Sequence, residues 1–280
     1  MTIYCETGTQ QVVGDTAITL SGVIPDHLNR AYALVWVSDN GSTTTGADYW
    51  TGMCELTGAS ELTVYVTGAT ASPRTQVSYC VVWCTEDEFY TEYFSGSYLT
   101  AGTTDTSTLS HSFSDATRRM IVGETQASTT QSGNQVYSTF EFSDATTVLA
   151  TRGATGAVAY YAGWAILWRA ETGVIITTGE MDLAGTIQNG TTTTHGSSVS
   201  DKTRQALFQN TRHEVAGLEQ LSVSSYLSSG TQIWWERYDQ ATSYQSYSRW
   251  FLVAFPTGGI VCQSEESSAT GTGLTASITL

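Results

Sequence analysis

The sequence has very little positive charge. Lys and Arg together number 11 of 280 residues, Lys202 is the single lysine, and the formal net charge is −15. Nucleic acids and anionic membrane surfaces are bound by clustered basic side chains that neutralise phosphate groups. The composition therefore predicts that neither nucleic acid nor a membrane surface is a partner.

Long apolar runs are also missing. The chain contains no stretch of 18 apolar residues, the length needed to cross a bilayer as a helix. The opening residues, Met1 to Glu6, form neither a basic segment nor an apolar core, so no secretory signal is expected there.

Motifs of known catalytic sites are absent too. The sequence lacks GxSxG, HExxH, P-loop and GxGxxG patterns, and we identify no carboxylate pair suited to glycoside hydrolysis. The acidic run Glu86–Glu88 with Glu92 is more typical of a solvated or edge-protecting strand segment than of a calcium site. The four histidines share no spacing and are interpreted as surface residues: His27, His111, His195 and His213. We expect no enzymatic activity, metal or cofactor.

The number of cysteines is odd, so they cannot all pair within one chain. Cys80 and Cys84 are four residues apart on a predicted strand, about 13 Å, too far for a mutual disulfide. Two interpretations stay open. The cysteines are buried free thiols, or Cys5 or Cys262, near the termini, crosslinks neighbouring subunits.

A repeat is the strongest positive feature. Gly68-Ala69-Thr70 and Cys80–Trp83 recur 85 positions later as Gly153-Ala154-Thr155 and Ala165–Trp168, and Leu252–Phe255 marks a third copy. A second landmark, Thr117-Arg118-Arg119, resembles Thr211-Arg212-His213. Trp83, Trp168 and Phe255 should then lie at equivalent strand ends. A period of this length indicates one small sandwich domain per copy.

The composition predicts strands rather than helices. Thr, Ser and Gly are abundant, Pro numbers 3, and charged residues make up 13%. Strands are expected in the first two copies at 30–38, 49–57, 61–67, 76–85, 119–127, 136–142, 146–152 and 158–169. For 201–221 a helix is the alternative to a strand.

The predicted fold is therefore all-β, with three tandem antiparallel β-sandwich modules. We expect an N-terminal strand plus module 1 at 1–103, module 2 at 104–195, and module 3 plus a C-terminal strand at 196–280. The closing stretch 271–280 alternates apolar residues but has no protecting Lys or Pro, which favours pairing with another subunit.

One stretch is unusually rich in aromatic residues. The favoured interpretation is that alternate members face the sandwich core and the rest form cross-strand pairs. The alternative is an exposed recognition patch, because flat aromatic faces beside carboxylates suit sugar rings and protein hot spots. The candidate ligand- or partner-binding residues are Trp234, Trp235, Tyr238, Tyr244 and Tyr247.

In module 2, Thr147–Gly153 followed by Ala157–Tyr161 and Ala165–Trp168 resembles a repeat module of structural proteins of tailed bacteriophages. The resemblance is weaker in the first copy, where Thr67 stands in place of Arg152. It implies a virion component, such as a capsid decoration protein, head fibre or tail appendage. The partners it implies are other capsid or tail proteins, and we expect a homo-oligomer. A carbohydrate-binding adhesin contacting a host glycan is the alternative function.

Overall fold

The protein folds almost entirely into β-strands. The computed structural model describes residues 2–39, 51–66, 75–129, 131–184, 191–214, 223–237 and 245–256. Within these ranges there is no α-helix, and the helical content consists of short 3-10 turns at Gly133–Gln135, Ala170–Thr172 and Lys202–Arg204. The predicted all-β class is confirmed.

The strands of the described residues fall into three sets of six, which we call unit 1, unit 2 and unit 3. Unit 1 contains β1 (Ile3–Val12), β2 (Thr16–Thr19), β3 (Ala31–Asp39), β4 (Gly52–Gly58), β5 (Glu61–Val66) and β6 (Thr75–Cys84). Unit 2 contains β7 (Phe89–Tyr98), β8 (Thr104–Thr108), β9 (Arg119–Ala127), β10 (Ser138–Phe142), β11 (Thr147–Arg152) and β12 (Ala159–Trp168). Unit 3 contains β13 (Ile175–Ala184), β14 (Thr191–Thr194), β15 (Gln205–His213), β16 (Val223–Ser229), β17 (Gln232–Arg237) and β18 (Gln245–Ala254).

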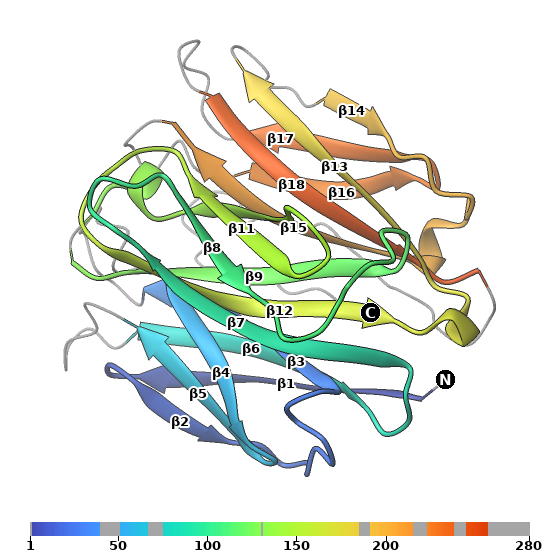
Figure 1. Cartoon of the computed structure of the whole chain (residues 1–280), viewed down its shortest axis with the longest axis horizontal. Coiled ribbons are helices and arrows are strands. Elements are labelled where there is room, and N and C mark those ends of the chain that lie inside the picture. Colours follow the sequence, from blue (N-terminus) through green and yellow to red (C-terminus); the bar gives the residue numbers. More distant parts are fainter. Residues whose placement is uncertain are drawn as a thin grey trace, which may run out of the picture.

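The three units have one topology. The first sheet of each joins its first, sixth and third strands, in the orders β1-β6-β3, β7-β12-β9 and β13-β18-β15. The second sheet joins the second, fifth and fourth strands, in the orders β2-β5-β4, β8-β11-β10 and β14-β17-β16. Figure 1 shows the units following one another from the blue to the orange end of the chain. The fold is thus three tandem antiparallel sandwiches.

The expected module limits after residues 103 and 195 remain predictions. Strand pairing groups β7 with β12 and β9, and β13 with β18 and β15.

Units 1 and 2 are joined edge to edge. Gly52 of β4 pairs with Thr125 of β9, so that β2-β5-β4-β9-β12-β7 forms one six-stranded sheet. The units share a continuous apolar core, which extends to Phe251, Val253 and Phe255 of unit 3. A second core lies between the two sheets of unit 3, around Trp235 and Trp250.

The helix considered for 201–221 does not form in the described part of that segment. Asp201 begins a single 3-10 turn, and Gln205–His213 is a ladder-paired strand. Long-range pairing with β18 therefore decides the conformation, whereas the local sequence left both open.

The tryptophan landmarks lie on equivalent strands, but one residue out of register. The N–H groups of Cys84, Trp168 and Phe255 each donate to an arginine carbonyl at the same corner of their unit. Cys84, not Trp83, is therefore the equivalent of Trp168. Because a shift of one residue changes the face, Trp168 is buried, whereas Trp83 stacks on Tyr4 on the other face of its strand.

Candidate functional site

Each unit has an aspartate–arginine corner just before the third strand. The arginine N–H donates to the aspartate carbonyl (2.9–3.1 Å), and the two side chains form an ion pair. The pairs are Asp26–Arg30 (3.6 Å), Asp115–Arg118 (2.7 Å) and Asp201–Arg204 (3.8 Å). In units 2 and 3 the aspartate also accepts hydrogen bonds from the N–H and hydroxyl of a threonine two residues later. These bonds hold the pKa of Asp115 and Asp201 below the usual range.

The corners correct part of the predicted repeat. Asp115-x-Thr117-Arg118 matches Asp201-x-Thr203-Arg204, whereas the sequence comparison had paired Thr117-Arg118 with Thr211-Arg212. The Asp-x-Thr-Arg pattern was the signal that could have identified this corner. It was overlooked because units 1 and 2 differ there, since Asp26 and Arg30 are separated by one residue more.

The corner fixes the end of the central strand in each unit. The arginine carbonyl accepts a hydrogen bond from the N–H of Cys84, Trp168 or Phe255. The arginine side chain donates to a carbonyl at or next to the same strand end, on Thr85, Trp168 or Pro256. In each unit the arginine thus holds the connection before the third strand against the end of the sixth strand.

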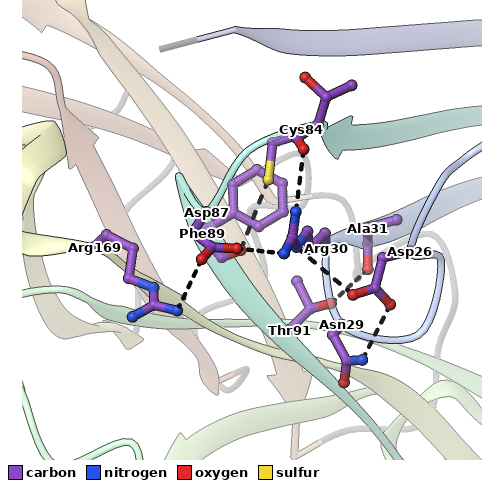
Figure 2. Close-up of polar contacts among 10 residues, drawn as sticks. Asp26, Asn29, Arg30, Ala31, Cys84, Asp87, Phe89, Thr91 and Arg169 are labelled. Carbon is purple, nitrogen blue, oxygen red and sulfur yellow. Dashed lines mark hydrogen bonds and ion pairs between the residues drawn. The ribbon is translucent and has the colours of Figure 1, made fainter.

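The first two corners also bind the next unit. Asn29 O accepts a hydrogen bond from Thr91 N of β7 (2.7 Å), and Thr117 O accepts one from Ile176 N of β13 (2.6 Å). At the first junction Asp87 lies between Arg30 (2.5 Å) and Arg169 (3.7 Å), as Figure 2 shows. The corner is therefore both an internal clamp and an inter-unit contact.

A second pair of contacts crosses the junctions through polar side chains. Glu124 of β9 accepts hydrogen bonds from Val35 N and from Cys54 N (3.0 Å), both in unit 1. Asn210 of β15 donates from Nδ2 to Gly123 O of unit 2 (2.7 Å). Loss of hydration raises the pKa of Glu124 to about 8, so this carboxyl is largely protonated at neutral pH.

A shallow pocket adjoins the first junction. It has a volume of about 420 Å³ and is lined by Glu86, Asp87, Glu88, Arg169, Glu171 and Thr172. Glu88 accepts a hydrogen bond from Thr2 N (2.5 Å), and Asp87 is engaged by two arginines. In the described residues no group of three or more His, Cys, Asp or Glu side chains could hold a metal ion.

Two of the four histidines depart from the surface role expected of them, whereas His111 is exposed and His27 partly exposed. His195 and His213 are buried, and His213 Nδ1 is hydrogen-bonded to the Ser246 hydroxyl (2.7 Å). Burial lowers the pKa of His195. His213 ends β15 and is paired with Ser246 of β18, and the His195 N–H donates to Thr231 O, so both buried side chains belong to the packing of unit 3.

The aromatic candidates do not form one surface. Trp235 is fully buried with Leu252 and Trp250 between the sheets of unit 3, because its position in β17 faces β18. Its neighbour Trp234 therefore points to the opposite face of β17, where it lies near Tyr226 (ring centroids 6.3 Å).

Tyr247 lies elsewhere again. Its side chain is on the opposite face of β18 from that of Trp250. The guanidinium of Arg212 lies over its ring, with Cζ 4.1 Å from the ring centroid. Tyr238 and Tyr244 lie outside the described residues. Trp235 is thus a core residue, as the core interpretation predicts, and the alternative of one recognition patch is corrected, because Trp234 and Tyr247 lie on opposite sides of the sandwich.

Two cysteines meet on neighbouring strands. The Sγ atoms of Cys5 on β1 and Cys80 on β6 are 3.3 Å apart. The hydrogen bond from Cys80 lowers the pKa of Cys5 to about 7 and raises that of Cys80. Cys54 and Cys84 are buried, as the free-thiol interpretation predicts, and Cys262 lies outside the described residues. The crosslink through Cys5 or Cys262 stays a prediction.

No family model and no curated protein matches this chain. The described part of the chain also has no helix long and apolar enough to cross a membrane. Function must therefore be inferred from the repeat and its junctions.

Proposed function

We propose that the protein is a non-enzymatic structural component of a bacteriophage virion, a capsid decoration protein, head fibre or tail appendage. The observation that carries the scaffold part of this proposal is the repeated junction. Two successive unit boundaries use the same backbone hydrogen bond and an equivalent polar side chain. A chain that fixes the relative placement of its domains so closely is suited to bearing load and presenting surfaces.

The viral part of the proposal rests on the resemblance of Thr147–Trp168 to phage repeat modules. In that stretch Arg152 is buried, and its guanidinium donates to the carbonyls of Leu99, Gly102, Gln135 and Ala157. The resembling residues thus include the one that ties four backbone segments of unit 2 together. They account for a packing pattern and supply no catalytic group.

The adhesin alternative has less support. Glycan recognition by stacking needs accessible aromatic faces on one surface. Trp235 is buried, and Trp234 and Tyr247 lie on opposite sides of unit 3.

Antibody labelling of intact particles tests the proposal. Purified phage particles from a lysate that contains this protein should carry it in fixed stoichiometry, and gold-labelled antibody should mark one structural position. Its absence from washed particles, or a copy number that varies with washing, would contradict a virion role. A glycan array with the wild-type chain and Trp234→Ala would reveal the adhesin function instead.

A further inference from the structure

The outer face of the first sheet is covered in units 2 and 3. On the central strand of unit 2 this face carries Trp164, Ile166 and Trp168, all buried. On the central strand of unit 3 it carries the equivalent residues Phe251, Val253 and Phe255, also buried and part of the core shared with unit 2. Trp168 and Phe255 meet edge to face across the second junction, at 5.7 Å.

The same face of unit 1 is only partly covered by the described residues, since Tyr32 on it is buried. Its central strand β6 carries Cys80, Val82 and Cys84 at these positions, and only Cys84 is buried. On β3, Trp36 is 56% exposed. Leu34, Cys80 and Val82 beside it are half-buried, so one exposed tryptophan stands at the edge of a partly apolar face, as at many interaction surfaces.

Trp36 occupies the position that forms the inter-unit contact elsewhere. The cross-strand pairs Trp36–Ser78, Glu124–Ala162 and Asn210–Arg249 are equivalent in the three first sheets. Glu124 and Asn210 each bond to the preceding unit. In unit 1 a tryptophan stands at this position, the residue type most enriched at the centres of protein interfaces.

The backbone groups that form the hydrogen bond between successive units also have equivalents in units 1 and 3. Thr91 N and Ile176 N bond to Asn29 O and Thr117 O of the preceding unit. By strand register the equivalent of Thr91 and Ile176 in unit 1 is Cys5. The equivalent of Asn29 and Thr117 in unit 3 is Thr203, the residue before Arg204 of the third corner. Unit 1 thus has the receiving surface of a junction, and unit 3 has the corner that a junction uses.

We propose that the outer face of β1-β6-β3, centred on Trp36, binds unit 3 of a second copy of this chain. The contact continues the two junctions within the chain, so copies join head to tail. Such a heterologous contact does not pair the same surface on both partners, and it generates rings or open filaments. The inference goes beyond the proposed function, because it requires only the repeat geometry and no viral particle.

Sedimentation velocity and light scattering of the full chain over a wide concentration range test this proposal. Mass should grow past the dimer as concentration rises. Trp36→Asp should weaken association about thirtyfold, the effect of losing a hot-spot residue. The control is Leu99→Asp, because Leu99 is 73% exposed in the turn after β7, away from both ends, and this variant should assemble like wild type. Because both side chains are exposed, neither substitution should change the unfolding midpoint.

A mixing experiment identifies the direction of the contact. A Trp36→Asp chain still offers its own unit 3 to a wild-type unit 1, so adding it should shorten wild-type assemblies by capping one end. Assembly that stops at a dimer would indicate a symmetric contact and overturn the head-to-tail proposal. A wild-type chain that stays monomeric at every concentration, or a Trp36→Asp chain that assembles normally, would overturn it as well.

Discussion

The guanidinium of Arg152 lies over the ring of Tyr98, with Cζ 4.9 Å from the ring centroid. Arg152 is 1% exposed, and no carboxylate is among the partners of its charge. Four backbone carbonyls and one aromatic face take that role, which agrees with the weak hydration of a guanidinium relative to an ammonium group. The end of β11 is thereby joined to the turn after β7 and to the connections around Gln135 and Ala157.

Replacing Arg152 by Met should destabilise the protein by about 3 kcal/mol, since buried carbonyls lose their donors. Arg152→Lys should also destabilise it, because three donors on a compact ammonium cannot reproduce the planar fork. Urea unfolding measures both. The control is Arg169→Met, whose half-exposed side chain makes a single 3.7 Å ion pair and should cost at most about 1 kcal/mol. Equal costs at the two sites would contradict this role for Arg152.

The carboxyl of Glu124 should make stability fall as pH rises. Its pKa is about 8 in the folded protein, above the ordinary value of a glutamate. Between the unfolded and folded pKa values the folded state holds a proton that the unfolded state has lost, so unfolding becomes easier toward pH 8. Each unit of raised pKa corresponds to about 1.4 kcal/mol.

Glu124→Gln tests this linkage. The amide oxygen still accepts a hydrogen bond at the Val35 junction, but it cannot ionise. Thermal unfolding between pH 5 and pH 9 should therefore show a smaller loss of stability for the variant than for wild type. Because the high net negative charge also disfavours the folded state at alkaline pH, the measured quantity is the difference between the two proteins. Parallel stability curves would show that Glu124 does not carry the effect.

Much of the fold could be predicted from the sequence. The expected strands at 30–38, 61–67, 119–127 and 146–152 coincide within one residue or two with β3, β5, β9 and β11. Alternating apolar residues and turn chemistry are local signals, and they were sufficient for these elements. Strand β7, Phe89–Tyr98, was not predicted, since its aromatic residues occur on both faces and it lacks a clear period of two.

The junctions could not be predicted in this way. The exposure of Trp36 depends on which sheet face meets a neighbouring unit, and the burial of Trp235 depends on which face of β17 meets the other sheet of unit 3. Both are tertiary properties. A one-residue error in register, as between Trp83 and Cys84, exchanges the faces completely. Aromatic composition is alike in a core and on a binding surface, so the sequence left both interpretations of the aromatic stretch open.

Cys5 should react with iodoacetamide near neutral pH. Its pKa of about 7 results from the thiol of Cys80, which donates a hydrogen bond to the Cys5 sulfur. The pH profile of alkylation, followed by mass spectrometry of the peptide that contains Cys5, should have its midpoint near that value. Cys80→Ala removes the donor and should move the midpoint upward. An unchanged profile would contradict the assignment.

The same pair should form a disulfide within one chain. Oxidised glutathione would accept the two electrons and two protons lost by the thiols and would leave as two reduced molecules. A non-reducing gel should then show monomers, with the Cys5 and Cys80 peptides linked. Disulfide-linked dimers through Cys5 would instead support the crosslink between subunits that the sequence left open.

His195 should make the protein sensitive to mild acid. Burial lowers its pKa in the folded state, so below the ordinary histidine value of about 6.5 the unfolded state binds more protons, and stability falls as pH decreases. This sign is opposite to that of Glu124. His195→Phe should reduce the loss of stability between pH 7 and pH 5, whereas the control His27→Phe, at a partly exposed site, should not. Thermal unfolding at the two pH values gives the comparison.

The second and third aspartate–arginine corners should differ in their contribution to stability, although their local hydrogen bonds are alike. Asp115→Ala and Asp201→Ala each remove the acceptor for a threonine N–H, a threonine hydroxyl and an arginine. Of these two corners, that of Asp115 also supports a hydrogen bond between units in the described residues, from Ile176 N to Thr117 O. At low concentration, Asp115→Ala should therefore lower the urea midpoint more than Asp201→Ala. At high concentration Asp201→Ala should weaken self-association, because its corner is the one offered to a second copy. If Asp201→Ala left assembly unchanged while Asp115→Ala weakened it, the third corner would not be the end through which copies join.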